Sequence, residues 1–444
     1  MKKNIFLIGL NEFNRAKLES LENSADYKFH SLLEYEEVVD PEEYDIKELI
    51  GKAEKKLKDF DGSIDAIIGY MDFPVSTMVP ILCKKLGVRS SSVESFLKCE
   101  HKYWSRIEQK KAIPDNIPDF YVFDPFSENP IESIKLPYPF WIKPVKSFGS
   151  HLGFKIHNKK EFDRAVSLIK ESIGRIGEPF DDLLEYADVD LPEEIEAINS
   201  NYCLAESIIG GRQCTIEGCV YNGEFHSHGV VDSIRYPHKS VFFRYQYPSQ
   251  LPASVQKRMK EIGEKLLKHL DYNNSAFNME FFWDKTRDKI WFLEINTRVA
   301  QHHSDLFQKV DGVSNHQVPV DLALDKRPLI PSGKGKHDFA AAIFYREFQD
   351  AIVENVPDDA TIKQIQQTFP DTVVQLDVEK GMRLSDLPEQ DSYSFICALI
   401  YMGSKNQQEL LANYKTLLKK MDFRFSPLPD KQQPPFVGEN VDND

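Results

Sequence analysis

Two glutamates, Glu280 and Glu294, lie in a segment whose pattern predicts a β-hairpin. Apolar and polar residues alternate on both sides of a polar turn that runs from Asp284 to Lys289. A hairpin folded about residue 287 would place Glu280 directly opposite Glu294, and like charges in that position repel each other. A divalent cation would remove the repulsion, and oxygen ligands suit magnesium. The spacing therefore predicts a metal site.

Two more polar residues follow Glu294 at alternate positions. The period of two places Glu294, Asn296 and Arg298 on one face of the second strand, where Asn296 would add an oxygen ligand and Arg298 a positive charge. The same period assigns apolar residues to the opposite face: Trp291, Leu293 and Ile295. An ordinary amphipathic hairpin with a solvated outer face has the same pattern. Residues elsewhere in the chain are therefore needed to distinguish a metal site from a solvated face.

Residues suited to a polyphosphate occur upstream of the hairpin. Residues 146–153, KSFGSHLG, form a loop of small residues just after a predicted strand that ends at Lys143. Backbone N–H groups of such a loop can surround phosphates, although the loop is not a Walker A motif. Lys102 and Arg106 are one turn apart on a predicted helix, and Glu206 ends an apolar strand. A polar loop and a solvated helix face are the simpler alternatives for these segments.

The order of the predicted elements divides the chain into parts. Residues 1–95 alternate strand and helix signals, which predicts a small parallel α/β domain. Residues 96–330 contain a charged helix, a strand meander and the hairpin, while residues 331–425 predict an α+β module. Residues 176–200 are acidic and rich in turn formers, and are expected to be a surface excursion. The tail, 426–444, is expected to be disordered.

The composition excludes several classes of protein. The 444 residues carry a net charge of −15 without a basic run, which argues against a nucleic-acid partner. No apolar run reaches the roughly 18 residues of a membrane span. The six cysteines form no Cys-x-x-Cys pair and are typical of reduced thiols in a cytoplasmic protein.

Together these segments resemble the ATP-grasp superfamily over roughly residues 1–330, and residues 331–425 resemble the C-terminal domain of its carboxylate–amine (L-amino acid ligase-like) branch. The resemblance implies an α/β and α+β architecture with a Rossmann-like N-terminal domain and two α+β subdomains that hold ATP between them. It rests on the order of these elements: Lys102, Lys143 before Pro144, the loop 147–153, LAESIIGG at 204–211, NMEF at 278–281 and FLEINTR at 292–298.

The resemblance also implies roles for individual residues. ATP would be bound by these residues: Lys102, Lys143, Ser147, Gly149, Ser150, Gly153, Glu206, Ser207, Ile208, Ile209 and Gln213. The lysines would contact the phosphates, and Gln213 stands where family members often carry an acid near the ribose. Magnesium, or manganese in its place, would be bound by Glu280, Glu294 and Asn296. Arg298 would contact the acyl phosphate.

The implied reaction joins a small-molecule carboxylate to an amine. The carboxylate would attack the γ-phosphorus of ATP, and the amine would attack the resulting acyl phosphate, with release of ADP and phosphate. Substrate-facing candidates are Arg235, Arg244, His302 and His303, each of which could equally be structural. A carboxylation of the biotin-carboxylase kind and an ATP-binding sensor without turnover are the alternatives. A homodimer is a possible assembly, because similar proteins are often dimers.

Overall fold

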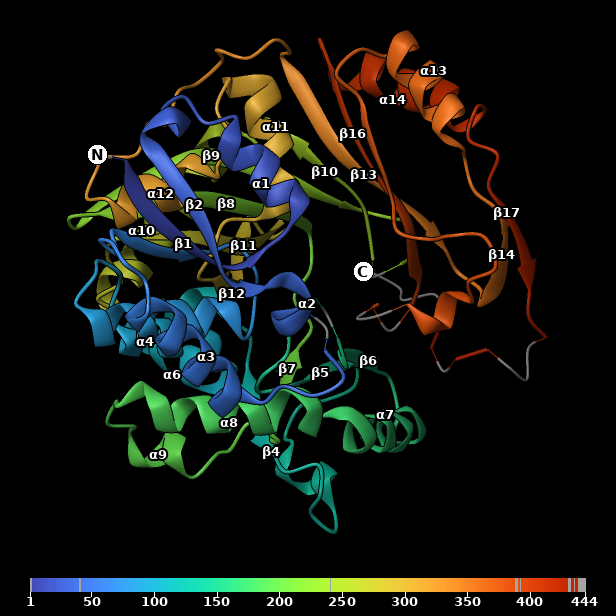
Figure 1. Cartoon of the computed structure of the whole chain (residues 1–444). Coiled ribbons are helices and arrows are strands. Elements are labelled where there is room, and N and C mark those ends of the chain that lie inside the picture. Colours follow the sequence, from blue (N-terminus) through green and yellow to red (C-terminus); the bar gives the residue numbers. More distant parts are fainter. Residues whose placement is uncertain are drawn as a thin grey trace.

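The computed structural model describes residues 2–39, 41–149, 151–239, 241–387, 390–391, 393–429, 433–434 and 436–437. In Figure 1 the N-terminal residues, in blue, lie beside yellow and green strands from the middle of the chain. Teal and green elements form a separate layer below them, and the C-terminal elements, in orange and red, lie to the right. Within the described residues, no helix has both the length and the apolar character that a membrane span requires.

The N-terminal part is a parallel α/β domain, as the alternating strand and helix signals predict. Strand β1 (Lys3–Leu10) lies between β2 (Tyr27–Glu34) and β3 (Ala66–Gly69), and it is parallel to both. Helices on both faces bury nearly the whole of β1, which is why its sequence is apolar throughout. The helices of this part are α1 (Glu12–Glu19), α2 (Tyr35–Val38), α3 (Ile46–Lys58), α4 (Val75–Leu86) and α5 (Val93–Glu100).

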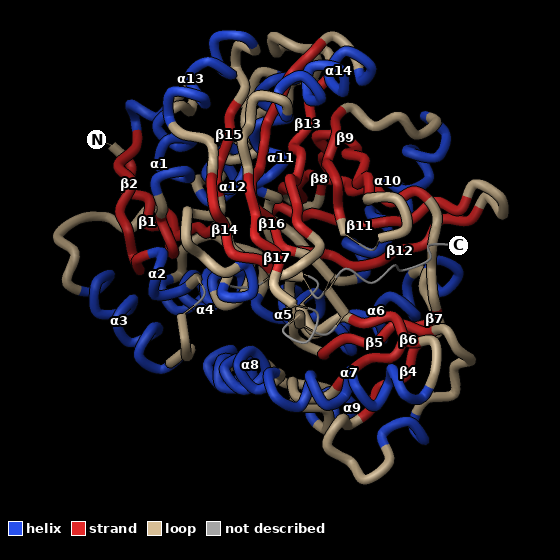
Figure 2. The backbone as a smooth tube through the Cα atoms, turned by 90° about the vertical axis from the view of Figure 1, so that its right-hand side faces the viewer, coloured by secondary structure: helices blue, strands red, loops and turns tan. Residues whose placement is uncertain are grey.

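A small antiparallel sheet follows, in the strand order β4-β7-β5-β6. Its strands are β4 (Phe120–Phe123), β5 (Phe140–Pro144), β6 (Phe154–Ile156) and β7 (Cys203–Ser207). The helices of this region are α6 (Lys102–Ala112), α7 (Lys159–Ser172), α8 (Gly174–Ala187) and α9 (Glu193–Glu196). We refer to these strands as the small sheet; Figure 2 shows them at the lower right.

The prediction of a surface excursion at 176–200 is wrong. Helix α8 buries Ile176, Phe180 and Leu183 in the same apolar cluster as residues of the N-terminal domain. Acidic residues such as Glu178 occupy its exposed face, so the high charge of the segment conceals an amphipathic helix.

The remaining strands join one large sheet, in the order β12-β11-β8-β9-β10-β13-β16-β15. The strands of the large sheet are β8 (Arg212–Tyr221), β9 (Glu224–Arg235), β10 (Phe242–Tyr247), β11 (Ser275–Asp284), β12 (Lys289–Asn296), β13 (Phe339–Glu347), β15 (Val373–Leu376) and β16 (Phe395–Ser404). Helices pack around it: α10 (Ala253–His269), α11 (Gln301–Asp311), α12 (Gln317–Ala323), α13 (Asp359–Thr368) and α14 (Gln407–Leu418). The C-terminal strands β13, β15 and β16 therefore continue the sheet that contains the hairpin, across the predicted boundary near residue 330.

Part of the tail packs against the rest of the chain. Strand β17 (Arg424–Pro427) pairs with β14 (Ala351–Asn355), and the backbone N–H of Asp350 donates to Oε1 of Gln433 at 2.6 Å. The Phe436 ring is buried 4.8 Å from that of Phe154. These contacts contradict disorder for the residues concerned. The other parts of the predicted tail, 430–432, 435 and 438–444, lie outside the described residues.

Candidate active site

The hairpin has the predicted register at its acidic pair. Strands β11 and β12 are antiparallel, with Glu280 opposite Glu294 and Asn278 opposite Asn296. A β-bulge follows this pair, because the next partner of β11, Phe281, is Phe292 and Leu293 is skipped. The bulge turns the polar end of β12 relative to the rest of the strand.

The bulge also corrects one prediction about the faces of β12. Ile290, Phe292 and Ile295 are the residues that enter the apolar core. Trp291 and Leu293 are only partly buried, so the expected apolar face of Trp291, Leu293 and Ile295 does not exist. A strict period of two fails here because the extra residue at Leu293 changes the phase of the alternation.

The acidic pair is electrostatically unfavourable on its own. Burial, and then the negative charge of Glu294, raise the pKa of Glu280 to about 7 against the opposing effect of Arg298. Asn296 lies beside the pair, with its Nδ2 3.5 Å from Oε1 of Glu280. Among the described residues no cluster of three His, Cys, Asp or Glu side chains forms a metal site, so here an amide joins two acids. Two carboxylates and an amide fit a divalent magnesium ion.

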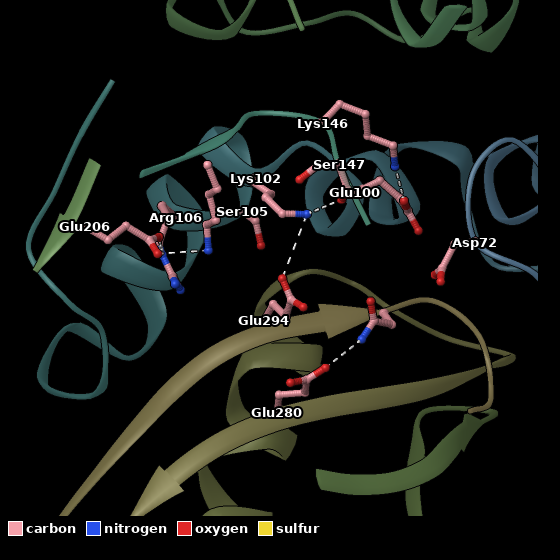
Figure 3. Close-up of polar contacts among 12 residues, drawn as sticks. Asp72, Glu100, Lys102, Ser105, Arg106, Lys146, Ser147, Glu206, Glu280 and Glu294 are labelled. Atoms are coloured by element: carbon pink, nitrogen blue, oxygen red, sulfur yellow. Dashed lines mark hydrogen bonds and ion pairs between the residues drawn. The ribbon is translucent and has the colours of Figure 1, made fainter. Parts of the chain in front are cut away.

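A cleft of about 460 Å³ separates the hairpin from helix α6 and the strand β5 (Figure 3). Lysine, arginine and glutamate side chains from different elements meet in it. Its charged lining consists of Asp72, Glu100, Lys102, Arg106, Lys143, Lys146, Glu206 and Glu294. Negative groups on the floor therefore face positive groups above them, which is the charge pattern required by a metal-bound polyphosphate.

Lys102 projects from the first turn of α6 toward the hairpin (Figure 3). Its Nζ donates to the carbonyl oxygen of Ser147 at 2.6 Å and lies 3.9 Å from Oε2 of Glu294. Its backbone N–H is bonded to the carbonyl of Val145, which ties the helix start to the small-residue loop. Lys102 thus connects the loop predicted to surround phosphates with the predicted metal ligands.

Lys143 and Arg106 share a buried partner, Glu206. Nζ of Lys143 lies 2.9 Å from one carboxylate oxygen of Glu206, and Nε of Arg106 donates to the other at 2.6 Å. Burial opposes ionisation of Glu206, but Arg106 and then Lys143 lower its pKa to about 2. Glu206 is therefore a buried anion that holds two cations at the wall of the cleft. Of its neighbours, Ser207 and Ile209 are half-buried and Ile208 is exposed.

The small-residue loop forms the rim above Lys102. Ser147 is buried and lines the cleft, Gly149 has a positive φ of 59°, and Gly153 is buried at the start of β6. Glycine tolerates that φ without strain, so the loop can turn sharply at Gly149. The predicted contact of Ser150 lies outside the described residues.

Sequence patterns missed a second buried ion pair, between Lys146 and Glu100. Nζ of Lys146 forms a short contact with Glu100, whose other oxygen accepts from Oγ1 of Thr297 at 2.6 Å. The Lys146 ammonium also lies 4.6 Å from the ring centre of Phe180 and 5.3 Å from that of Phe73. Lys146 belongs to the small-residue loop, but nothing in the local sequence identifies a partner in α5.

Sequence patterns also failed to identify a row of polar residues that crosses β8, β11 and β12 next to the acidic pair. Glu217 on β8 lies opposite Asn278, which lies opposite Asn296. The fully buried Glu217 accepts from Nδ2 of Asn278 and from the backbone N–H of Ala300, both at 3.0 Å. It thereby orients the turn that carries Arg298, and also Asn278, which in turn accepts from Nδ2 of the predicted metal ligand Asn296 at 3.4 Å. The signal for it is the alternation of Gln213, Thr215 and Glu217 with apolar residues.

The predicted substrate residues lie in different places. Arg235 donates to Oε1 of Gln213 at 2.7 Å, and Gln213 donates to Glu280 at 2.8 Å, so both lie beside the acidic pair. Arg244 instead donates to Gln246 at 2.9 Å, in a polar cluster away from the hairpin. Gln213 therefore contacts a predicted metal ligand, although the family resemblance assigns it to the ribose.

The two histidines at the start of α11, His302 and His303, lie in different environments. His303 is buried and its Nδ1 lies 3.0 Å from Glu217. His302 is exposed, yet the surrounding protein lowers its pKa to about 4, with His303 and Arg298 acting in the same direction. Its ring lies 6.3 Å from that of Tyr245 and 5.6 Å from that of Phe344. The His302 ring therefore lies among aromatic side chains, and the positive charge of Arg298 acts on it.

Arg298 projects from the turn after β12 toward the N-terminal domain. Its Nε and one terminal nitrogen donate to the two carboxylate oxygens of Asp72, both at 2.8 Å. The carboxylate of Asp72 raises the pKa of the guanidinium against the effect of burial. Asp72 is therefore part of the site although no sequence pattern identified it.

Comparisons with known proteins identify the fold of this chain. Residues 136–305 match the family model described as the ATP-grasp domain. The structure is similar to an L-amino acid ligase from Bacillus licheniformis, with a TM-score of 0.74 and 16% identity over 96% of this chain and 99% of that one. No curated protein sequence matches at a significant level.

Two carboxylating enzymes are also similar. A biotin carboxylase from Campylobacter jejuni, solved with an ATP analogue, has a TM-score of 0.62 and 14% identity over 96% of this chain and 93% of that one. A biotin carboxylase domain from Hydrogenobacter thermophilus, solved with MgADP and bicarbonate, has a TM-score of 0.61 and 14% identity over 96% and 91%. The chain thus has the ATP-grasp fold with an N-terminal parallel-sheet domain, and residues 136–305 are an ATP-grasp domain.

Proposed function

We propose that the protein is an ATP-dependent carboxylate–amine ligase that forms an amide through an acyl phosphate and releases ADP and phosphate. One observation carries this proposal: Glu280 is paired with Glu294, which lies in a cleft lined by Lys102 and Lys143, and Arg298 follows the same strand. Phosphoryl transfer depends mainly on positioning and charge neutralisation, which such a cleft supplies.

The nucleotide would lie along the cleft. Lys102 and Lys143 would contact its phosphates, the loop 147–153 would close over them, and the segment 206–209 would hold the base. Magnesium bound by Glu280, Glu294 and Asn296 would neutralise and orient the phosphates. The buried pairs of Glu206 and Glu100 support this arrangement, because they fix the cations before any ligand arrives.

The carboxylate substrate would arrive beside Arg298. A guanidinium can hold the carboxylate first and the acyl phosphate afterwards through paired hydrogen bonds. Arg235, Tyr245 and His302 lie near this position and supply both a cation and aromatic rings. Such a surface suits a small molecule with a carboxylate and an apolar group, which agrees with the similarity in fold to an L-amino acid ligase.

The direct test is release of ADP from ATP and magnesium in the presence of amino acids, taken singly and in pairs. ADP that appears only with a carboxylate donor and an amine, together with an amide product detected by mass spectrometry, supports the proposal. ADP release that requires bicarbonate and free biotin would instead indicate carboxylation. Tight ATP binding without turnover under every condition would indicate a sensor.

The assignment of the metal ligands has its own test. Glu294→Ala should abolish magnesium-dependent ADP release, because one of two facing carboxylates is lost, while the circular dichroism spectrum stays unchanged. Glu264→Ala, on the exposed surface of α10, is the matched control and should retain the wild-type rate. An unaffected rate in Glu294→Ala would show that the metal is held elsewhere.

A further inference from the structure

Asp72 is an acidic side chain that the N-terminal domain contributes to the cleft. It lies in the turn between β3 and α4, and its two oxygens accept from Nε and a terminal nitrogen of Arg298 at 2.8 Å. About 27% of its side chain is exposed, against 18% for Arg298, and Asp72 itself lines the cleft. Figure 3 shows Asp72 at the opposite end of the cleft from Glu206.

Each of the other acidic side chains of the cleft already has an ion-pair partner or a proposed metal. Glu206 is enclosed between Arg106 and Lys143, and Glu100 is bonded to Lys146 and Thr297. The facing carboxylates on the hairpin suit a metal. Asp72 differs because its ion-pair partner, Arg298, is also the group that must contact the carboxylate and the acyl phosphate. Contacts of Arg298 with those groups would weaken its hold on Asp72 and leave a carboxylate beside the reacting carbon.

On the basis of the proposed function, we propose that Asp72 binds the ammonium group of the amine substrate and accepts a proton from it. An amine enters largely as an ammonium ion near neutral pH, and it has no lone pair for attack until one proton leaves. The position of Asp72 suits this task, since it is next to Arg298 and distant from the nucleotide end of the cleft. A positioned carboxylate is a common general base.

Amide formation removes two protons from the ammonium nitrogen of the amine substrate. One N–H proton moves to a carboxylate oxygen of Asp72, and the freed lone pair forms a C–N bond to the acyl carbon. The C–O bond to the phosphate then breaks, and its electron pair leaves with the phosphate. The second proton lost from nitrogen goes to the departing phosphate. No oxidant, reductant or further reactant is needed.

His302 is another side chain near Arg298 that could act as a base. Its surroundings lower its pKa to about 4, so its imidazole binds a proton weakly. It also carries no charge with which to hold an ammonium ion near neutral pH. Asp72 supplies the negative charge that His302 lacks.

The test compares two nucleophiles on Asp72→Asn. Hydroxylamine is largely uncharged near neutral pH and captures acyl phosphates as hydroxamates, so it needs no base to become nucleophilic. Asp72→Asn should form hydroxamate at a rate within about threefold of the wild type. Its kcat/KM for an amino acid as the amine should fall by about 100-fold or more, which is the usual contribution of general base catalysis. Asp65→Asn is a matched control, because Asp65 precedes β3 as Asp72 follows it and is paired with Lys3 at 2.7 Å.

An equal loss of hydroxamate and amide formation in Asp72→Asn would overturn the proposal, since Asp72 would then only position Arg298. Unchanged amide formation would overturn it as well. If Asp72→Asn melts well below the wild type, Asp72→Ser tests the same ratio of the two rates in a smaller side chain. Failure of the proposed function looks different, because the wild type itself would then form neither hydroxamate nor amide.

Discussion

Replacement of Glu280 by glutamine should stabilise the protein in the absence of divalent cations, and the gain should depend on pH. Burial, and then the charge of Glu294, raise the pKa of Glu280 from 4.5 to about 7. A difference of this size between the folded and unfolded chains corresponds to about 3 kcal/mol. The side chain is partly exposed, so solvent screening reduces this to about 2 kcal/mol.

The sign of the effect follows from the order of ionisation. Below pH 4.5 Glu280 is protonated in both states and costs nothing. As the pH rises, the unfolded chain ionises first, while the folded protein retains the proton up to about pH 7. The wild type therefore loses stability across this window, whereas Glu280→Gln has no proton to lose.

Urea unfolding in the presence of a chelator measures the difference. The free energy of unfolding of Glu280→Gln relative to the wild type should grow by about 2 kcal/mol between about pH 5 and pH 8. Magnesium added at about pH 8 should stabilise the wild type more than the variant. The exposed Glu264→Gln serves as control and should show no such trend. A constant difference at every pH would refute the account of Glu280 as a repelled, desolvated acid.

Two further predictions concern buried acids that hold the site together. Glu100→Gln should lower the free energy of unfolding by about 3 kcal/mol, measured by urea denaturation, because it leaves the buried Lys146 without its counter-charge. Glu217→Gln should raise the magnesium concentration for half-maximal ADP release about tenfold, because Asn278 and Asn296 lose their anchor. A change in the maximal rate alone would assign Glu217 a different role.

In the hairpin, sequence patterns predicted the pairing of the two glutamates but not the β-bulge next to it. A fold about residue 287 predicts that Glu280 meets Glu294, and this is confirmed. The turn itself pairs Asp284 with Lys289, which centres the fold half a residue earlier. The bulge at Leu293 then restores the predicted pairing. Alternation cannot reveal such a bulge, so the faces of Trp291 and Leu293 could not be predicted.

Sequence patterns could not predict two ion pairs of the site, for a different reason. Lys146 is paired with Glu100 and Arg298 with Asp72, and each partner lies on a distant element. Local spacing identifies partners only when they share a strand or a helix. The parallel N-terminal domain was predictable because its alternating strand and helix signals are local.

The continuous hydrogen bonding between β10 and β13 limits how this enzyme scaffold could be recombined. Residues such as Tyr245 and Ala342 are paired partners within one sheet, and the Tyr245 ring also lies 6.3 Å from that of His302. A chimera cut near residue 330 would have to rebuild that strand pair with a foreign partner. The C-terminal strands therefore cannot be exchanged as an independent unit. A graft intended to change substrate preference should carry β8 to β16 together.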